Sequence, residues 1–390
     1  MNRQLNTIAA GLAVAALAAG CSKYGVGADA EGKDFSPYAL AAAESSGYVP
    51  PAGGAGGELH LYNWSDYIAP DVVVGFEKAM GVRIVVDTFN SDEAMYAKLK
   101  AGGTGYDILF PSSYQIATMA REKMIIPLDH ARIPNVKANF AQDFAGQILD
   151  PEFRYNVPYI VTYTGFAYRK DKIPEGADVN SWSILSNPAI AGRVTLLDDI
   201  REVIGAGLMA LGHSINSTDP AEIEAAVGQV LKWRAGVRKF DAESYKTEVA
   251  DGSTWLGHGY SSDATQVICG DEDEGAEPRP DIGFALPKEG FTIAFDEMVI
   301  AADSKRPELA YAFVNYLYVP EVAAANMDYV CGASPVAGGI ELLDEDYRDL
   351  IVPSAEVLAA GQVLKGFEDR PDVMELYNRA WDRIKATDAD

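Results

Sequence analysis

A regular alternation of strand-like and helix-like segments between Leu59 and Tyr114 most constrains how this chain can fold. The segments follow in the order strand, helix, strand, helix, strand, over residues 59–62, 70–80, 82–89, 91–99 and 106–110. Such alternation predicts parallel strand pairing with right-handed crossovers, and therefore an α/β fold. Aromatic and small polar residues cluster where the predicted strands end, which is where open α/β sheets place their ligand sites.

Local signals support these segments and extend the same rhythm along the chain. Pro70 opens the first helix and Gly81 follows it, while Ser91 is a predicted N-cap of the second. Further strands are expected over 193–197, 281–286 and 293–301, and further helices over 200–211, 222–234, 307–318 and 321–327. No internal repeat is visible, and residues 58–390 suffice for two domains or one bilobal body.

The N-terminus carries the features of a bacterial export signal. Arg3 precedes a short apolar run over 8–19, and Leu17-Ala18-Ala19-Gly20 leads into Cys21, which resembles a lipobox. We therefore expect a lipoprotein signal peptide over 1–20 and a lipidated Cys21, with an ordinary signal peptide and a chance cysteine as the alternative. Residues 21–57 are rich in Ala, Gly, Ser and Pro, and predict a flexible tether.

The net charge limits the classes of ligand and partner, and the cysteines raise the question of a disulfide. The formal net charge is −25, which argues against a nucleic-acid partner and favours a cationic ligand, unless the charge only keeps the protein soluble. Cys269 and Cys331 could form a disulfide in an oxidising envelope or remain buried free thiols. The acidic run over 270–280 could hold Ca²⁺, but its spacing does not match an EF-hand loop, which favours a solvated insertion.

The hexapeptide Tyr62-Asn63-Trp64-Ser65-Asp66-Tyr67 resembles the putrescine- and spermidine-binding proteins of bacterial polyamine uptake systems. The resemblance continues at residues 95–99, 106–109, 111–114, 157–159, 198–203, 287–290 and 295–296. It implies the two-lobe periplasmic binding protein fold, in which two α/β lobes joined by crossing strands close over a ligand at a hinge. The lobes are expected over 58–160 with 294–341, and over 161–293 with 342–390.

Polyamine chemistry requires a particular mixture of side chains. Each buried ammonium needs a carboxylate, because an unpaired buried charge is costly, and aromatic faces pack on methylenes while attracting the cation. The resemblance implies that the ligand contacts are Trp64, Ser65, Tyr67, Ser112, Tyr114, Asp199, Glu202, Tyr260, Asp263 and Asp296. Among them we expect Glu202, Asp263 and Asp296 to receive ammonium groups.

Each of these residues also has a structural interpretation. Trp64 and Tyr67 could be core residues, Ser65 and Ser112 could cap helices, and Asp199 with Glu202 could complement a helix N-terminus. Three positions depart from the family pattern, since Tyr260, Ala294 and Gly332 stand where larger aromatics are usual. Phe295 or Tyr329 could compensate, or the altered aromatic box could suit an arylated or branched amine.

The resemblance implies a monomeric, lipid-anchored periplasmic protein that delivers a polyamine to an inner-membrane ABC permease and uses no metal or cofactor. A role in sensing, with a membrane receptor as partner, is the alternative among binding proteins. An envelope enzyme is disfavoured, since the chain has only four histidines and no G-x-S-x-G or H-E-x-x-H motif. His258 lies near Ser261 and Asp263 in sequence, but a structural role is favoured over a catalytic one.

Overall fold

A computed structural model describes residues 33–51, 57–89, 91–270, 277–367 and 370–387. The expected signal peptide, Cys21 and most of the acidic run over 270–280 lie outside these residues. The chain divides into two compact units. The described residues of Thr162–Ile293 and Asp349–Asp390 form unit 1, and those of Lys23–Val161 and Ala294–Arg348 form unit 2. The boundaries expected from the sequence were 160/161, 293/294 and 341/342.

The sheet of unit 2 follows the predicted alternation. Strand β1 (Glu58–Trp64) pairs in parallel with β2 (Arg83–Phe89) and with β3 (Ile108–Leu109). Strand β9 (Phe291–Ile300) adds to β3 in the antiparallel sense. Because β1, β2 and β3 run the same way, their carboxyl ends meet at one edge, where the predicted site residues follow.

The helices between these strands begin and end where their sequence signals predicted. Helix α3 spans Pro70–Met80, and Gly81 behind it has φ 64° and donates its N–H to the carbonyl of Glu77 at 2.8 Å. Helix α4 spans Asp92–Lys100, and the Oγ of Ser91 accepts the N–H of Ala94 at 3.1 Å. The other helices of unit 2 are α5 (Ile116–Arg121), α6 (Pro134–Asn139), α11 (Pro307–Leu317), α12 (Pro320–Val330) and α13 (Ala337–Glu341).

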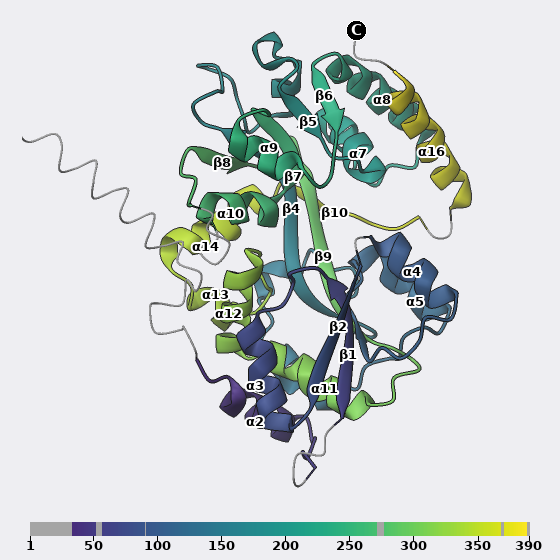
Figure 1. Cartoon of the computed structure of the whole chain (residues 1–390). Helices are drawn as coiled ribbons and strands as arrows, with labels where there is room; N and C mark the ends of the chain where they lie inside the picture. Colours follow the sequence, from purple (N-terminus) through teal and green to yellow (C-terminus); the bar gives the residue numbers. More distant parts are fainter. Residues whose placement is uncertain (1–32, 52–56, 90, 271–276, 368–369, 388–390) are drawn as a thin grey trace, which may run out of the picture. The chain divides into compact units, whose positions relative to one another are not determined.

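The tether expected over 21–57 is wrong for its middle part, because Ser36–Ser45 forms helix α2. The helix lies beside α3 and α11 in unit 2 (Figure 1). Phe35 and three alanines of the helix are buried there. Alanine-rich composition suggested a linker, yet its small side chains also permit the close helix packing that is observed.

Two contacts fix α2 in its place. A Cβ at Gly75 of α3 would lie 2.5 Å from the Cβ of Phe35, so only glycine allows this approach. On the other side, Nδ2 of Asn315 in α11 donates to the carbonyl of Ala42 at 2.8 Å and to Oγ of Ser45 at 2.9 Å. The helix is therefore part of the folded unit.

Unit 1 has a mixed sheet. Its strands are β4 (Val157–Arg169), β5 (Val194–Leu196), β6 (Val237–Phe240), β7 (Leu256–Tyr260), β8 (Ile282–Ala285) and β10 (Gly361–Val363). Strand β5, which was expected, pairs in parallel with β6 and β7, two strands that were not predicted. Strand β4 pairs antiparallel with β7 and β8. Strand β4 was not predicted, and the antiparallel pairing of β9 with β3 departs from the parallel pairing that alternation predicts. Both strands carry the chain from one unit into the other.

Helices pack around a large aromatic and aliphatic core in unit 1. They are α7 (Ile200–Ala210), α8 (Pro220–Arg234), α9 (Tyr245–Asp251), α10 (Ser261–Cys269), α15 (Ala355–Leu358) and α16 (Pro371–Ala386), while α14 (Glu345–Ile351) spans the boundary at 348/349. Helices α7, α8 and α16 lie side by side (Figure 1) and share a core with Trp182 and Trp233. Among the described helices, none combines the length and apolar character that crossing a membrane requires.

Candidate functional site

The carboxyl end of β1 in unit 2 presents Trp64 as a fixed aromatic wall. Its Nε1 donates to the carbonyl of Phe110 at 2.9 Å, and its ring lies 4.4 Å from that of Phe89 between centroids. The side chain is only half-buried, so one part of the indole stays open while its position is set. A rigid, partly exposed aromatic surface of this kind suits the methylenes and charge of an organic cation.

Asp296 on β9 accepts hydrogen bonds from two hydroxyl groups at the same edge of unit 2. Tyr67 donates its hydroxyl to Oδ2 at 2.6 Å, and Ser112 donates its hydroxyl to Oδ1 at 3.1 Å. Neither donor carries a charge, and no described residue forms an ion pair with this carboxylate. Burial raises the pKa of Asp296 to about 7, and nearby Asp92 adds to the effect. The group therefore lacks a compensating cation.

A hollow of about 310 Å³ lies within unit 2 and shares Tyr67 with this group, although neither Asp296 nor Ser112 lines it. Trp64, Tyr67 and Tyr329 line it together with aliphatic residues of α3 and β2. Of the two aromatics that could compensate for the altered box, Tyr329 therefore faces this hollow. Phe295 does not serve as a wall, because it is 1% exposed and packs edge-on against Phe144.

The remaining predicted residues of unit 2 are placed as follows. Ser65 is exposed, and since Ala69 occupies the N-cap of α3, the capping alternative for Ser65 is wrong. Ser112 precedes a short 3₁₀ turn without capping it through its side chain. Tyr114 lies half-buried in that turn.

Glu297 is a functional candidate that the sequence reasoning missed. It is completely buried, and its Oε1 accepts the hydroxyl of Ser113 at 2.5 Å. Burial raises its pKa to about 7. Because neighbouring residues of a strand point to opposite faces, Asp296 and Glu297 serve different surroundings. Two adjacent acids inside an apolar strand are the sequence signal that could have identified this second carboxylate.

Glu202 on α7 is the deepest carboxylate of unit 1. It is 4% exposed and accepts the hydroxyl of Thr164 at 3.1 Å and that of Thr292 at 2.6 Å. Burial, followed by the charge of Asp199, raises its pKa to about 8. Like Asp296, it is solvated by neutral hydroxyls, and no described residue forms an ion pair with it.

Asp199 has the structural role that was its alternative. As the N-cap of α7, its Oδ1 accepts the N–H of Arg201 at 2.8 Å and that of Glu202 at 3.0 Å. Burial nevertheless raises its pKa. The structure thus brings Asp199 and Glu202 together at one helix end, as their spacing predicted, and a ligand contact of Asp199 stays a prediction.

Asp263 in the first turn of α10 differs from the other two carboxylates, because a cation already pairs with it. Nζ of Lys246 lies 3.1 Å from its Oδ1, and Tyr245 donates its hydroxyl to Oδ2 at 2.7 Å. The same hydroxyl accepts the N–H of Tyr260 at 2.8 Å, which ties β7 to the group. Sequence reasoning missed Tyr245 and Lys246, since they come from a short helix that had not been predicted.

His258 and the two cysteines have no part in these groups. His258 is completely buried against Phe166 and Trp182, and burial lowers its pKa to about 3. Its structural interpretation is therefore confirmed. No disulfide joins Cys269 and Cys331 in the described part of the chain. Within the described part of the chain, no cluster of His, Cys, Asp and Glu could hold a metal ion.

Each unit therefore carries a carboxylate that accepts hydrogen bonds from neutral hydroxyls, buried in the case of Glu202 and half-buried in the case of Asp296. Such a group can stabilise an incoming cation by a charge-assisted hydrogen bond, and it is costly to keep ionised without one. Aromatic walls in unit 2 add an apolar surface beside the charge. The chemistry of both groups is suited to binding an ammonium ion.

Comparison with known proteins agrees with this chemistry. Residues 71–349 match the family described as bacterial extracellular solute-binding protein. A putrescine/cadaverine-binding protein of Pseudomonas aeruginosa is 34% identical over 84% of this chain and 93% of its own length. The putrescine-binding periplasmic protein of Escherichia coli is 33% identical over 84% of this chain and 91% of its own. A spermidine/putrescine ABC transporter substrate-binding protein from Streptococcus pneumoniae superposes with a TM-score of 0.75 at 31% identity, over 84% of this chain and 98% of its own.

Proposed function

This chain belongs to the bacterial extracellular solute-binding proteins, and within that family we propose that it captures a polyamine or related amine for an ABC transporter. Relatives named for binding putrescine, cadaverine or spermidine support the ligand class. The strongly acidic composition also favours a cationic ligand.

Asp296 is the observation that carries the proposal. A half-buried carboxylate that accepts hydrogen bonds from Tyr67 and Ser112 but has no cation beside it is arranged for a positive ligand group. Burial raises the pKa of Asp296 to about 7, and an ammonium beside the carboxylate would favour its ionised form. Trp64 supplies the neighbouring aromatic face.

Glu202 supports a second ammonium contact by the same argument. Its two threonine partners donate hydrogen bonds but provide no charge, and burial raises its pKa to about 8. We propose that capture of the amine favours a closed form of the protein. The mature protein would be held at the membrane through Cys21 and would pass the amine to an inner-membrane permease.

Calorimetric titration of the chain from Ser22 onward tests the proposal, because this form keeps every described residue. We expect 1,4-diaminobutane to bind in a one-to-one complex with Kd of about 1 μM or tighter, roughly −8 kcal/mol. The uncharged isostere 1,4-butanediol should not bind. Equal binding of the diol, or no binding of any amine, would contradict the proposed function.

A further inference from the structure

Among the predicted ligand carboxylates, Asp263 is the one that forms an ion pair with another described residue. Nζ of Lys246 lies 3.1 Å from Oδ1, and Tyr245 donates its hydroxyl to Oδ2 at 2.7 Å. The carboxylate and the ammonium side chains are 22% and 34% exposed, so solvent only partly weakens their attraction. Nζ of Lys246 has a second acceptor, Oε1 of Gln266 at 3.1 Å.

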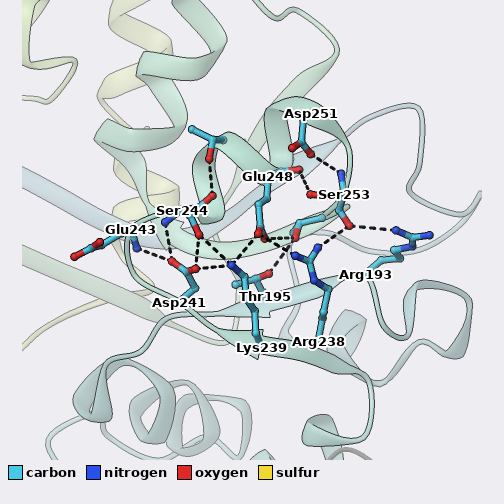
Figure 2. A network of polar contacts seen from close by, with 12 residues as sticks. Arg193, Thr195, Arg238, Lys239, Asp241, Glu243, Ser244, Glu248, Asp251 and Ser253 are labelled. Atoms are coloured by element: carbon cyan, nitrogen blue, oxygen red, sulfur yellow. Dashed lines mark hydrogen bonds and ion pairs between the residues drawn. The ribbon is translucent and has the colours of Figure 1, made fainter.

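Both partners of Asp263 come from the first turn of α9, and a dense ionic network holds that helix (Figure 2). Glu248 of α9 accepts from Arg238 at 2.9 Å and lies 2.8 Å from Nζ of Lys239. Lys239 also binds Asp241 at 2.5 Å and the hydroxyl of Ser244 at 3.0 Å, just before the helix begins. The network therefore anchors α9 to β6 at the end that presents Tyr245 and Lys246.

The ring of Tyr245 adds a second constraint. It is completely buried, and a Cβ on Gly259 of β7 would lie 2.0 Å from its Cε2, so glycine is required where the ring passes. Because Tyr245 is fixed between β7 and Asp263, the next residue is held close to the same carboxylate. The Lys246 ion pair is thus built into unit 1.

We propose that Lys246 is a specificity-determining residue that supplies Asp263 with an ammonium from the protein itself, so that the site prefers diamines to longer polyamines. The inference rests on the proposed function. Of the three carboxylates expected to receive ammonium groups, Glu202 and Asp296 then remain for the ligand. A third ligand ammonium would have to displace Lys246 or lie against it, and like charges at such range repel.

Paired titrations test the inference. The wild-type chain should bind 1,4-diaminobutane more tightly than spermidine, which carries three amines. Lys246→Met keeps most of the length of the side chain and removes its charge, so the ratio of spermidine to diamine affinity should rise about tenfold or more. Lys246→Arg retains the charge and should keep the diamine preference. Lys232→Met, at an exposed position on α8, should leave the ratio unchanged.

The outcomes separate the two proposals. If both amines bind but Lys246→Met leaves their affinity ratio unchanged, or if wild type prefers spermidine, the role of Lys246 is wrong while the function stands. If neither amine binds to wild type, the function itself is wrong. Should Lys246→Met not fold, Lys246→Gln carries the same test, because it also removes the charge.

Discussion

The Asp296 carboxylate has two neutral hydrogen-bond donors, Tyr67 and Ser112. Its charge can therefore be removed by a substitution that changes the shape of the side chain little. Asp296→Asn keeps the size of the side chain but leaves a ligand ammonium unpaired. We expect the loss of about 2–5 kcal/mol of binding free energy for 1,4-diaminobutane, or roughly 30-fold or more in Kd. Calorimetric titration of the variant measures this loss.

Asp303→Asn is the matched control, since this carboxylate is exposed in the same unit. Its affinity for the diamine should equal that of wild type. An Asp296→Asn variant that binds as tightly as Asp303→Asn would remove Asp296 from the site.

The raised pKa values of Asp296 and Glu202, about 7 and about 8, predict a pH dependence of binding. An ammonium ligand favours the ionised carboxylates, so any proton bound in the empty site must leave when the ligand binds. Affinity for the diamine should therefore rise from pH 6 to pH 8, by up to about tenfold per unit for each proton released. Titration in two buffers of different ionisation enthalpy counts the protons, and pH-independent affinity with no release would contradict this prediction.

At the scale of the element, substitutions of Asp199 at the N-cap of α7 can distinguish helix capping from ligand binding. Asp199→Ala removes the acceptor of two backbone N–H groups and should lower the free energy of unfolding by about 1 kcal/mol. Asp199→Ser restores a capping oxygen and should recover most of that loss in urea denaturation. Equal losses in both variants would contradict the cap. A fall in diamine affinity in Asp199→Ser would show that Asp199 also binds the ligand.

Helix α2 allows a second test, because one of its faces is buried and the other exposed. Phe35→Ala, at the N-cap of α2, should cost about 3 kcal/mol of unfolding free energy through the cavity it leaves between α2 and α3. Leu40→Ala on the same helix, where the side chain is 49% exposed, is the control and should change stability little. Equal, small effects in thermal unfolding would mean that α2 is not part of the folded unit.

The elements that were predicted well are those with strong local signals. Proline at the start of α3, Gly81 behind it and Ser91 before α4 act through the backbone of their own turn, so they can be read from the sequence. Helix α2 was missed because alanines are compatible with both a linker and a tight helix contact. Only the partner surface on α3 and α11 decides between them.

At the scale of the whole molecule, β4 was not predicted as a strand, and the antiparallel pairing of β9 was not anticipated. Periodicity indicates that a segment is a strand but does not say whether it stays in one unit, and both strands have residues in each. Strand β9 contributes Thr292, which binds Glu202, and Asp296 in the other unit. The carboxylates of the candidate site could be predicted from the resemblance. The contact of Lys246 with Asp263 could not, because it depends on how α9 packs, and no local sequence pattern indicates it.

A crystal structure of the chain from Ser22 onward with 1,4-diaminobutane tests the account most directly. We expect a ligand ammonium within about 3 Å of the Asp296 or the Glu202 carboxylate, with the Lys246–Asp263 ion pair intact. The methylenes should lie against Trp64. A diamine bound away from both Asp296 and Glu202 would contradict the account, even if its affinity were high.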